Sequence, residues 1–86
     1  MENNRFETGV TVKGAEPGST LLLRTAREAT DYLLNSWVGK RSPKHRAAMQ
    51  ACHDSIAGDK PAMNARRAFV TALREADLLV SDKALV

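Results

Sequence analysis

Two consecutive segments with helical periodicity, each introduced by a proline, constrain the fold of this chain more than any other feature of the sequence. The first segment begins at "SPKH", where Ser42 can cap a helix and Pro43 takes the first helical position, at which its missing N–H is not needed. The pattern predicts a helix that ends near Gly58 and buries one face. The residues predicted to share this face are His45, Met49, Cys52 and Ile56, with Ala48 beside them.

The second segment begins at "DKPAM" and is predicted to be helical to about Ala76. Its inward face is rich in alanine, a small residue that allows a neighbouring helix to approach closely. This inward face consists of Ala62, Ala65, Phe69, Ala72, Leu73 and Ala76. The outward face is polar or charged and consists of Asn64, Arg67, Thr71, Arg74 and Glu75.

A further helix is predicted upstream, because "TARE" matches the capping-box pattern. In this pattern the hydroxyl of Thr25 and the carboxylate of Glu28 each accept a hydrogen bond from a backbone N–H at the helix start. Gly39 is suited to end this helix in the left-handed conformation. The residues predicted to face the core are Ala26, Ala29, Leu33 and Trp37.

The region before this helix has the features of a β-hairpin. In "GVTVKG" the valines Val10 and Val12 alternate with polar residues, which is typical of a half-buried strand. The following "AEPGS" predicts a turn, since Gly18 tolerates a positive φ. "STLLLR" predicts the second strand, with Leu22 on the less protected face and with Leu21 and Leu23 pointing inward.

Together these elements predict one α+β domain, in which a two-stranded antiparallel hairpin packs against three α-helices in the order β-β-α-α-α. We expect the compact domain to span residues 8–80, between a flexible tail of residues 1–7 and a C-terminal tail of residues 81–86. The pattern does not decide whether residues 78–80 add a short strand.

Composition indicates a protein that folds without a disulfide in a reducing compartment, for which we predict the cytoplasm. The chain has 86 residues and one cysteine, which has no partner for an internal disulfide. The start of the chain lacks the apolar run of a secretory signal, and no stretch approaches the roughly 18 apolar residues that span a bilayer, so membranes are not expected as partners. The net charge of +3 is small beside that of dedicated nucleic-acid binders.

Three stretches of the sequence carry a family resemblance, and these are "LRTAREATDYLLNSW", "SPKHRAAMQACHDSIAG" and "ARRAFVTALREADL". Over residues 10–80 the chain resembles domain-of-unknown-function family 982, a family of small bacterial proteins. The family pattern commonly has a glycine where this chain has Asp77. The resemblance implies a compact fold of a hairpin and helices, and it implies no activity, so no catalytic residue follows from it.

The residues themselves do not indicate an enzyme, a metal site or a cofactor. Cys52 lies on the apolar face of its helix, which predicts a buried and inert thiol. His45 lies on the same face, where we expect it to pack rather than to act as an acid or base. Seven helical positions separate the two residues by about 10 Å along the axis, too far for shared tetrahedral zinc.

The basic segment "KRSPKHR" admits two interpretations. Its cations surround the predicted start of the second helix, where free N–H groups favour anions, so the segment could bind a phosphate or an acidic partner. Alternatively, the long side chains extend into water from a solvated connector, and this interpretation is favoured. The candidate anion contacts are Lys40, Arg41, Lys44 and Arg46.

The function predicted is that of a small non-enzymatic interaction or regulatory module. Its partner is an unknown protein or a second copy of the chain, since Leu22, Tyr32 and residues 84–86 would benefit from cover. Arg66 is expected to cover core with its stem and to pair with an acid such as Glu28 or Asp31. The alternative is a nucleic-acid-binding regulator with a helix-turn-helix-like pair, whose candidate contacts are Asn64, Arg67, Thr71 and Arg74.

Overall fold

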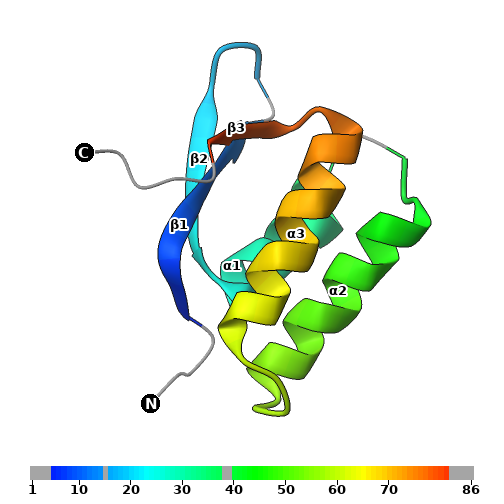
Figure 1. Ribbon diagram of the computed structural model, residues 1–86. Coiled ribbons are helices and arrows are strands. Elements are labelled where there is room, and N and C mark those ends of the chain that lie inside the picture. Colours follow the sequence, from blue (N-terminus) through cyan, green and yellow to red (C-terminus); the bar gives the residue numbers. More distant parts are fainter. Residues whose placement is uncertain (1–4, 15, 38–39, 82–86) are drawn as a thin grey trace.

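The computed structural model describes residues 5–14, 16–37 and 40–81, and it has the α+β architecture that the sequence predicts. Three helical regions lie on one side of an antiparallel sheet (Figure 1). The elements in chain order are β1 (Arg5–Lys13), β2 (Thr20–Thr25), α1 (Ala26–Asp31), the π-helical turn η1 (Tyr32–Ser36), α2 (Pro43–Ile56), α3 (Ala62–Ala76) and β3 (Leu79–Ser81). Because η1 continues α1 directly, the two form the first of the three predicted helices.

The sheet has three strands among the described residues, so the prediction of a two-stranded hairpin is wrong in this respect. The strand order is β2-β1-β3, and both pairs are antiparallel. β3 reaches β1 because the chain reverses after α3 at Asp77, which adopts the left-handed conformation with φ 59° and ψ 38°. The carbonyl oxygen of Leu78 then accepts a hydrogen bond of 2.9 Å from the N–H of Lys13.

Both predicted tails contain residues of the sheet. β1 begins at Arg5, so residues 5–7 are part of a strand, and the side chain of Phe6 is only 4% exposed. Ser81 is the last residue of β3. A lone aromatic residue in a polar stretch gives no periodic signal, and only its neighbours in the folded chain reveal that it is buried. Residues 1–4 and 82–86 lie outside the described residues.

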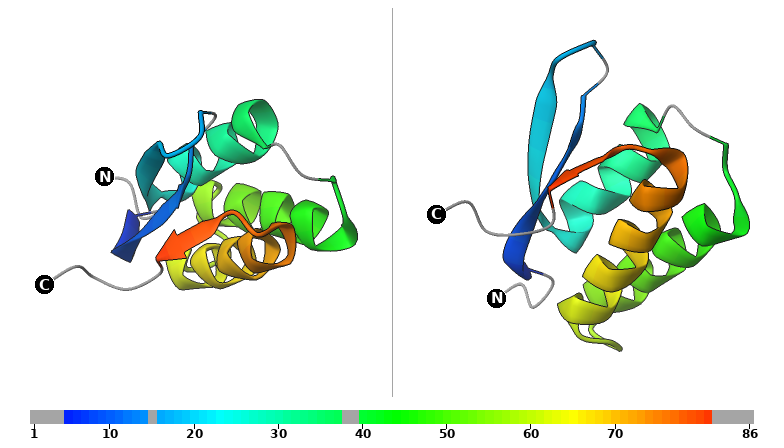
Figure 2. Two further views of the ribbon diagram at one scale, coloured as in Figure 1. Left: turned by 90° about the horizontal axis from the view of Figure 1, so that it is seen from above. Right: turned by 45° about the horizontal axis from the view of Figure 1, so that its top comes forward.

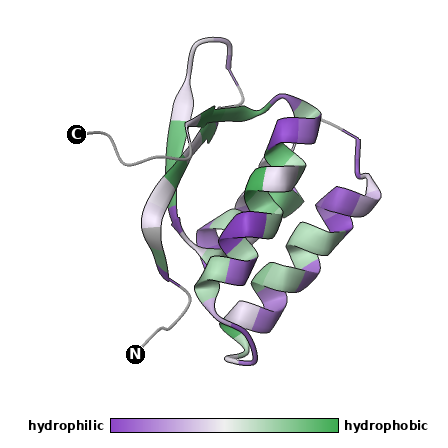
Figure 3. Cartoon of the chain, in the orientation of Figure 1, coloured by the Kyte–Doolittle hydropathy of each residue, from purple (hydrophilic) through white to green (hydrophobic). Residues whose placement is uncertain are grey.

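The core lies between the sheet and the helices. In Figure 3 β3 is strongly hydrophobic in colour, while hydrophilic and hydrophobic residues alternate along α2 and α3. The largest fully buried side chains come from β1, η1, α2 and α3, and they are Val10, Val12, Leu33, Cys52, Phe69 and Leu73. All four elements therefore contribute to one hydrophobic cluster.

Predictions about three apolar side chains differ from the structure. Ile56 was expected on the buried face of α2 but is 37% exposed, because it is the last residue of that helix. Tyr32 was expected on an exposed face but is 3% exposed, because the end of β1 and α3 both reach it. Its hydroxyl donates a hydrogen bond of 2.7 Å to the carbonyl oxygen of Lys13, and its ring meets that of Phe69 edge-on. Leu21 was expected inside but is 44% exposed, because the helix beside it leaves a groove open. Leu22 is 49% exposed, as expected.

The predicted starts of the first two helices are confirmed by their hydrogen bonds. The hydroxyl of Thr25 accepts from the N–H of Glu28 at 3.1 Å. The carboxylate of Glu28 accepts from the N–H of Arg24 at 2.7 Å, one residue earlier than the capping box predicts. Ser42 caps α2, with Pro43 in the first turn. The predicted end of the first helix at Gly39 lies outside the described residues.

Candidate functional site

The basic segment before α2 closes the end of the first helix. The last carbonyl groups of a helix have no partner within the helix and need one elsewhere. Here Arg41 Nη2 donates to the carbonyl oxygen of Leu34 at 3.0 Å. The indole Nε1 of Trp37 donates to the carbonyl oxygen of Lys40, also at 3.0 Å. These bonds tie Lys40 and Arg41 to the end of the first helix, so Arg41 has a structural role.

His45 joins α2 to the same helix end. Its Nε2 lies 3.0 Å from the carbonyl oxygen of Leu33, and since a carbonyl can only accept, Nε2 carries the proton. The side chain is buried, and its ring meets the edge of Trp37 at a centroid distance of 4.9 Å. The geometry agrees with the predicted packing role of His45.

The start of α2 already has an anion beside it from within the chain. The Ser42 hydroxyl accepts from the N–H of His45 at 3.3 Å and donates to the carboxylate of Glu75, which lies in the last turn of α3. Lys44 Nζ lies 3.9 Å from the other oxygen of this carboxylate. A negative charge near a helix N-terminus is favourable, so Glu75 supplies the interaction that a bound phosphate would make there. This arrangement supports the connector interpretation of the segment.

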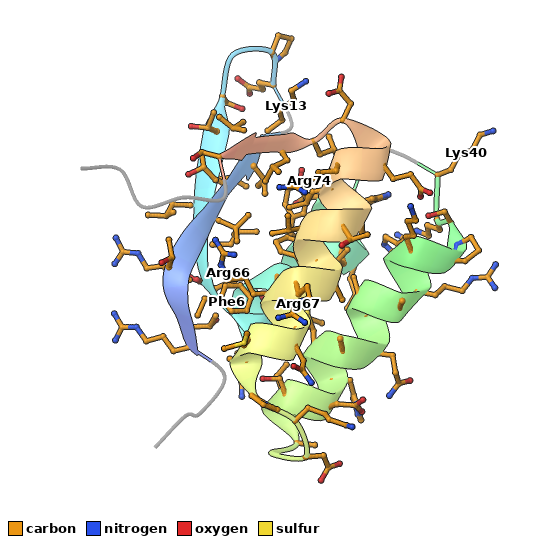
Figure 4. The ribbon with its side chains drawn as sticks, viewed as in Figure 1. Phe6, Lys13, Lys40, Arg66, Arg67 and Arg74 are labelled. Carbon is orange, nitrogen blue, oxygen red and sulfur yellow. The ribbon has the colours of Figure 1, made fainter. Side chains whose placement is uncertain are left out.

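The remaining cations of the segment lie elsewhere. Arg46 and Arg41 line a shallow depression of about 450 Å³ along one side of α2, together with Met49, Gln50 and His53. Lys40 is exposed and extends away from the helices (Figure 4). The four predicted anion contacts therefore do not converge on one point.

A groove between α2 and α3 brings together candidate residues from both helices. It has a volume of about 450 Å³. Its lining combines two alanines, Ala47 and Ala68, with polar side chains, among them Arg67 on the outer side of α3 (Figure 4). We call it the α2–α3 groove, and it is lined by Lys44, Ala47, Asn64, Arg67, Ala68 and Thr71. Among the described residues, Arg74 is not part of this lining, although sequence analysis placed it on the same face.

The two helices that form the groove do not cross as in a helix-turn-helix motif. α2 and α3 lie side by side and run in opposite directions (Figures 1 and 2). In the DNA-binding motif the two helices meet at about 90–120°. The polar face of α3 therefore forms one wall of a groove, and the helix pair differs in geometry from the helix-turn-helix-like pair of the alternative prediction.

Two comparisons place this architecture among known proteins. The family model described as "Protein of unknown function (DUF982)" matches residues 9–80. The chain belongs to the DUF982 family. It is also similar to Agrobacterium tumefaciens protein Atu1219, solved by NMR, with 32% sequence identity and a TM-score of 0.77 over 99% of this chain and 84% of that chain. A search of curated proteins finds no match.

The thiol of Cys52 in this DUF982 protein is buried in the core. Cys52 is fully buried, and burial raises the pKa of its thiol to about 11, against a smaller lowering by a hydrogen bond with Thr30. The thiolate, which is the nucleophilic form, is therefore scarce at neutral pH. Among the described residues, no group of three or more His, Cys, Asp or Glu side chains could hold a metal ion. No helix in the described part of the chain is long and apolar enough to cross a bilayer.

Arg66 of the DUF982 chain connects α3 to the sheet. It lies near Phe6 between the two elements (Figure 4), and its Nε donates to the carbonyl oxygen of Thr8 at 2.8 Å. The side chain is half-buried, as predicted for a stem that covers core. The bond to β1 gives Arg66 a partner that the sequence did not indicate.

A second groove, which the sequence did not indicate, lies between β2 and the first helix. Its volume is about 420 Å³. We call it the β2–α1 groove, and its main lining residues are Leu21, Leu23, Glu28, Asp31, Tyr32 and Asn35. Two acids on the polar side of α1 were visible in the sequence, but their position beside the exposed Leu21 depends on how the helix turns back along the strand.

Proposed function

We propose that this DUF982 protein is a small non-enzymatic interaction module that binds an acidic helical segment of a partner protein in the α2–α3 groove. The observation that carries this proposal is that Lys44 and Arg67, from two helices, line one groove together with two alanines. The free thiol of Cys52 supports a site of action in the reducing cytoplasm.

The shape of the groove suits a helix. The short side chains of Ala47 and Ala68 in its lining allow the backbone of a third helix to approach, as in helix-in-groove recognition. Arg67 is exposed, and its charge is available for a carboxylate on the incoming helix. Asn64 and Thr71 lie one turn before and one turn after Arg67 and offer hydrogen-bonding groups along the same wall. The exposed Met63, at 60%, adds an adaptable apolar contact nearby.

A nucleic acid is less well supported as the ligand. Its phosphates would also be attracted by Lys44 and Arg67. However, a duplex presents a row of phosphates and needs several cations along the groove, whereas Lys44 already has the carboxylate of Glu75 at 3.9 Å from its Nζ. An acidic helix can bind through a single carboxylate at Arg67. The side-by-side helices also lack the crossing angle that places a recognition helix in the major groove (Figure 1).

The test is a titration with two probes. The first is a fluorescein-labelled synthetic helix with glutamates at positions i and i+4 around leucines, and the second is a short DNA duplex. Arg67→Glu should weaken peptide binding at least about tenfold, which corresponds to ~1.4 kcal/mol. Arg46→Glu is the matched control, because it makes the same charge change on another side of α2, and it should change affinity by less than about twofold.

Three outcomes would overturn the proposal. Equal losses in the two variants would show attraction by net charge alone, without a groove. Backbone amide shifts that appear with the duplex but not with the peptide, and that depend on Arg67, would assign the groove to nucleic acid. The absence of shifts along α2 and α3 with both probes would leave the groove without a binding role.

A further inference from the structure

The outer edge of β2 is open to a further strand. β2 lies at one end of the order β2-β1-β3, and within the described residues its outer edge pairs with no strand (Figure 2). Two of its leucines, Leu21 and Leu22, are each nearly half exposed. Natural sheets usually protect such an edge with lysine, proline or a bulge, because an open edge pairs readily with another chain. Residues 20–23 contain neither lysine nor proline.

The register shows which backbone groups point outward. The N–H of Gly14 donates to the carbonyl oxygen of Ser19 at 2.8 Å at the hairpin end. Hydrogen-bonded pairs in an antiparallel ladder recur at every second residue, so the next such pair joins Val12 to Leu21, which lie opposite each other. The N–H and carbonyl of Leu22 therefore point away from β1, toward the open edge.

The open edge is short and has a defined end. Thr20 lies two residues before Leu22 in the strand, so its backbone N–H and carbonyl also point away from β1. At Arg24, the next outward residue, the N–H already donates to the carboxylate of Glu28 at 2.7 Å. An added strand can thus pair with residues 20–22. Beyond them the N–H of Arg24 is already bonded to Glu28 and is not available to a further strand.

The β2–α1 groove lies directly beside this edge. Leu21, Leu23 and Tyr32 give it an apolar base, while Glu28 and Asp31 place carboxylates on its rim. Tyr32 belongs to the π-helical turn η1, and such turns are frequent at functional sites. The rim is acidic in a chain whose net charge is +3, so this surface differs in charge from the rest of the molecule.

The charge of the rim decides between two kinds of occupant. A second copy would pair its β2 antiparallel to this one, with the two Leu22 residues opposite each other on a two-fold axis. In this register the core-facing sides of the two sheets lie on the same side of the joined sheet. The helix beside each strand would then lie against its counterpart, with Asp31 and Glu28 of one copy facing those of the other. Like charges at such a contact are unfavourable, whereas a basic strand would meet opposite charges.

We propose that an extended, basic segment of a partner protein binds the open edge of β2 as a fourth strand. Its backbone pairs with Thr20 and Leu22, its apolar side chains enter the β2–α1 groove, and its basic side chains contact Asp31 and the rim. This surface is separate from the α2–α3 groove, so the module has two docking sites of opposite charge preference.

The probe for this surface is a synthetic peptide of alternating valine and lysine, followed by amide hydrogen exchange and backbone amide shifts. The peptide should slow exchange of the Leu22 amide at least about tenfold, because an outward N–H gains a partner. A peptide with glutamate in place of lysine should not bind, because it meets the acidic rim. A valine–lysine peptide with a central proline should not bind, because it lacks a backbone N–H for the edge.

Two protein variants separate the rim from overall charge. Asp31→Lys should weaken binding of the valine–lysine peptide at least about tenfold. Asp59→Lys makes the same charge change in the exposed turn after α2 and should have less than about a twofold effect. Arg67→Glu, which tests the α2–α3 groove, should leave binding of this peptide unchanged, so the two proposals succeed or fail independently.

Three results would overturn the inference. The first is an unaltered Leu22 amide in the presence of the peptide. The second is equal weakening by Asp31→Lys and Asp59→Lys, which would leave only bulk charge attraction. The third is protection of the Leu22 amide that rises with protein concentration without peptide, together with twice the chain mass in light scattering, which would assign the edge to a second copy.

Discussion

Burial has different consequences for two residues on the same face of α2. His45 keeps a polar partner, since its Nε2 donates to the carbonyl oxygen of Leu33 at 3.0 Å. Cys52 lies deeper, in apolar surroundings that disfavour the charged thiolate and raise its pKa to about 11. The single cysteine of the chain is thereby held in its unreactive, neutral form.

The raised pKa of Cys52 predicts a pH dependence of stability. From the unfolded value of 9.0 to the folded value of about 11, the unfolded state loses the thiol proton while the native state keeps it. The contribution of Cys52 is therefore fully present below pH 9 and is lost as the pH rises toward 11, and its size is on the order of 2 kcal/mol.

Urea unfolding at pH about 8 and about 10.5 measures this effect. Cys52→Ala should lose less stability between the two values than the original chain, and the difference isolates Cys52 from other groups, including Tyr32, whose pKa burial also raises. An identical pH dependence in both proteins would contradict the prediction.

The connection between η1 and α2 shows how a charged segment can be structural. Four residues in and beside this segment interact with groups of the same chain. Trp37 donates to the carbonyl oxygen of Lys40, and Arg41 donates to that of Leu34. Ser42 caps α2, and Lys44 forms an ion pair with Glu75. A similar number of cations on a surface often indicates a ligand site. Here partners within the chain account for the charged groups of two of the four cations, Arg41 and Lys44.

Arg41→Ala tests this structural role against Lys40→Ala. Loss of Arg41 removes the donor to the carbonyl oxygen of Leu34 and should lower the free energy of unfolding by about 1 kcal/mol. Lys40 contributes its backbone carbonyl, which alanine also has, so its variant should be within about 0.5 kcal/mol of the original. Chemical denaturation compares the two, and equal stabilities would mean that Arg41 is only a solvated surface charge.

At the scale of the whole molecule, α3 is the central element. It packs on α2, on β1 and on β3, and its last turn sends the chain back into the sheet. Phe69 is its largest fully buried side chain and meets the ring of Tyr32 edge-on at a centroid distance of 6.1 Å. A domain of this size has a thin stability margin, so it depends strongly on such a residue.

Phe69→Ala should lower the free energy of unfolding by about 3–5 kcal/mol, because it leaves a cavity where helix and sheet meet. Phe69→Leu fills most of the volume and should lose no more than about 1.5 kcal/mol. Thermal and urea unfolding of both variants checks the difference. A loss below about 1 kcal/mol in Phe69→Ala would show that Phe69 is not central to the core.

Local chemistry made most helix boundaries and buried faces predictable. The side chains of Thr25 and Ser42 act within three residues of their own position, so their caps follow from short sequence motifs. The stripe of α3 is buried as expected at Ala65, Phe69 and Leu73, because a helix turns at a fixed angle per residue.

The candidate sites were less predictable, because they combine distant parts of the chain. Lys44 and Arg67 belong to different helices, and they line the same groove only because of the way α2 and α3 pack. Glu75 reaches Ser42 over 33 positions. The open edge beside Asp31 became visible only when β3 paired on the opposite side of β1 and left β2 outermost.

The sequence by itself determined where the helices begin, which faces they bury and that two strands precede them, since these depend on bonds and rotations among near neighbours. The tertiary structure alone decided that β3 is the third strand of the sheet, that Tyr32 is buried and that Glu75 accepts a hydrogen bond from Ser42 at the start of α2. Those outcomes depend on contacts between segments far apart in the chain, whose packing no local pattern specifies.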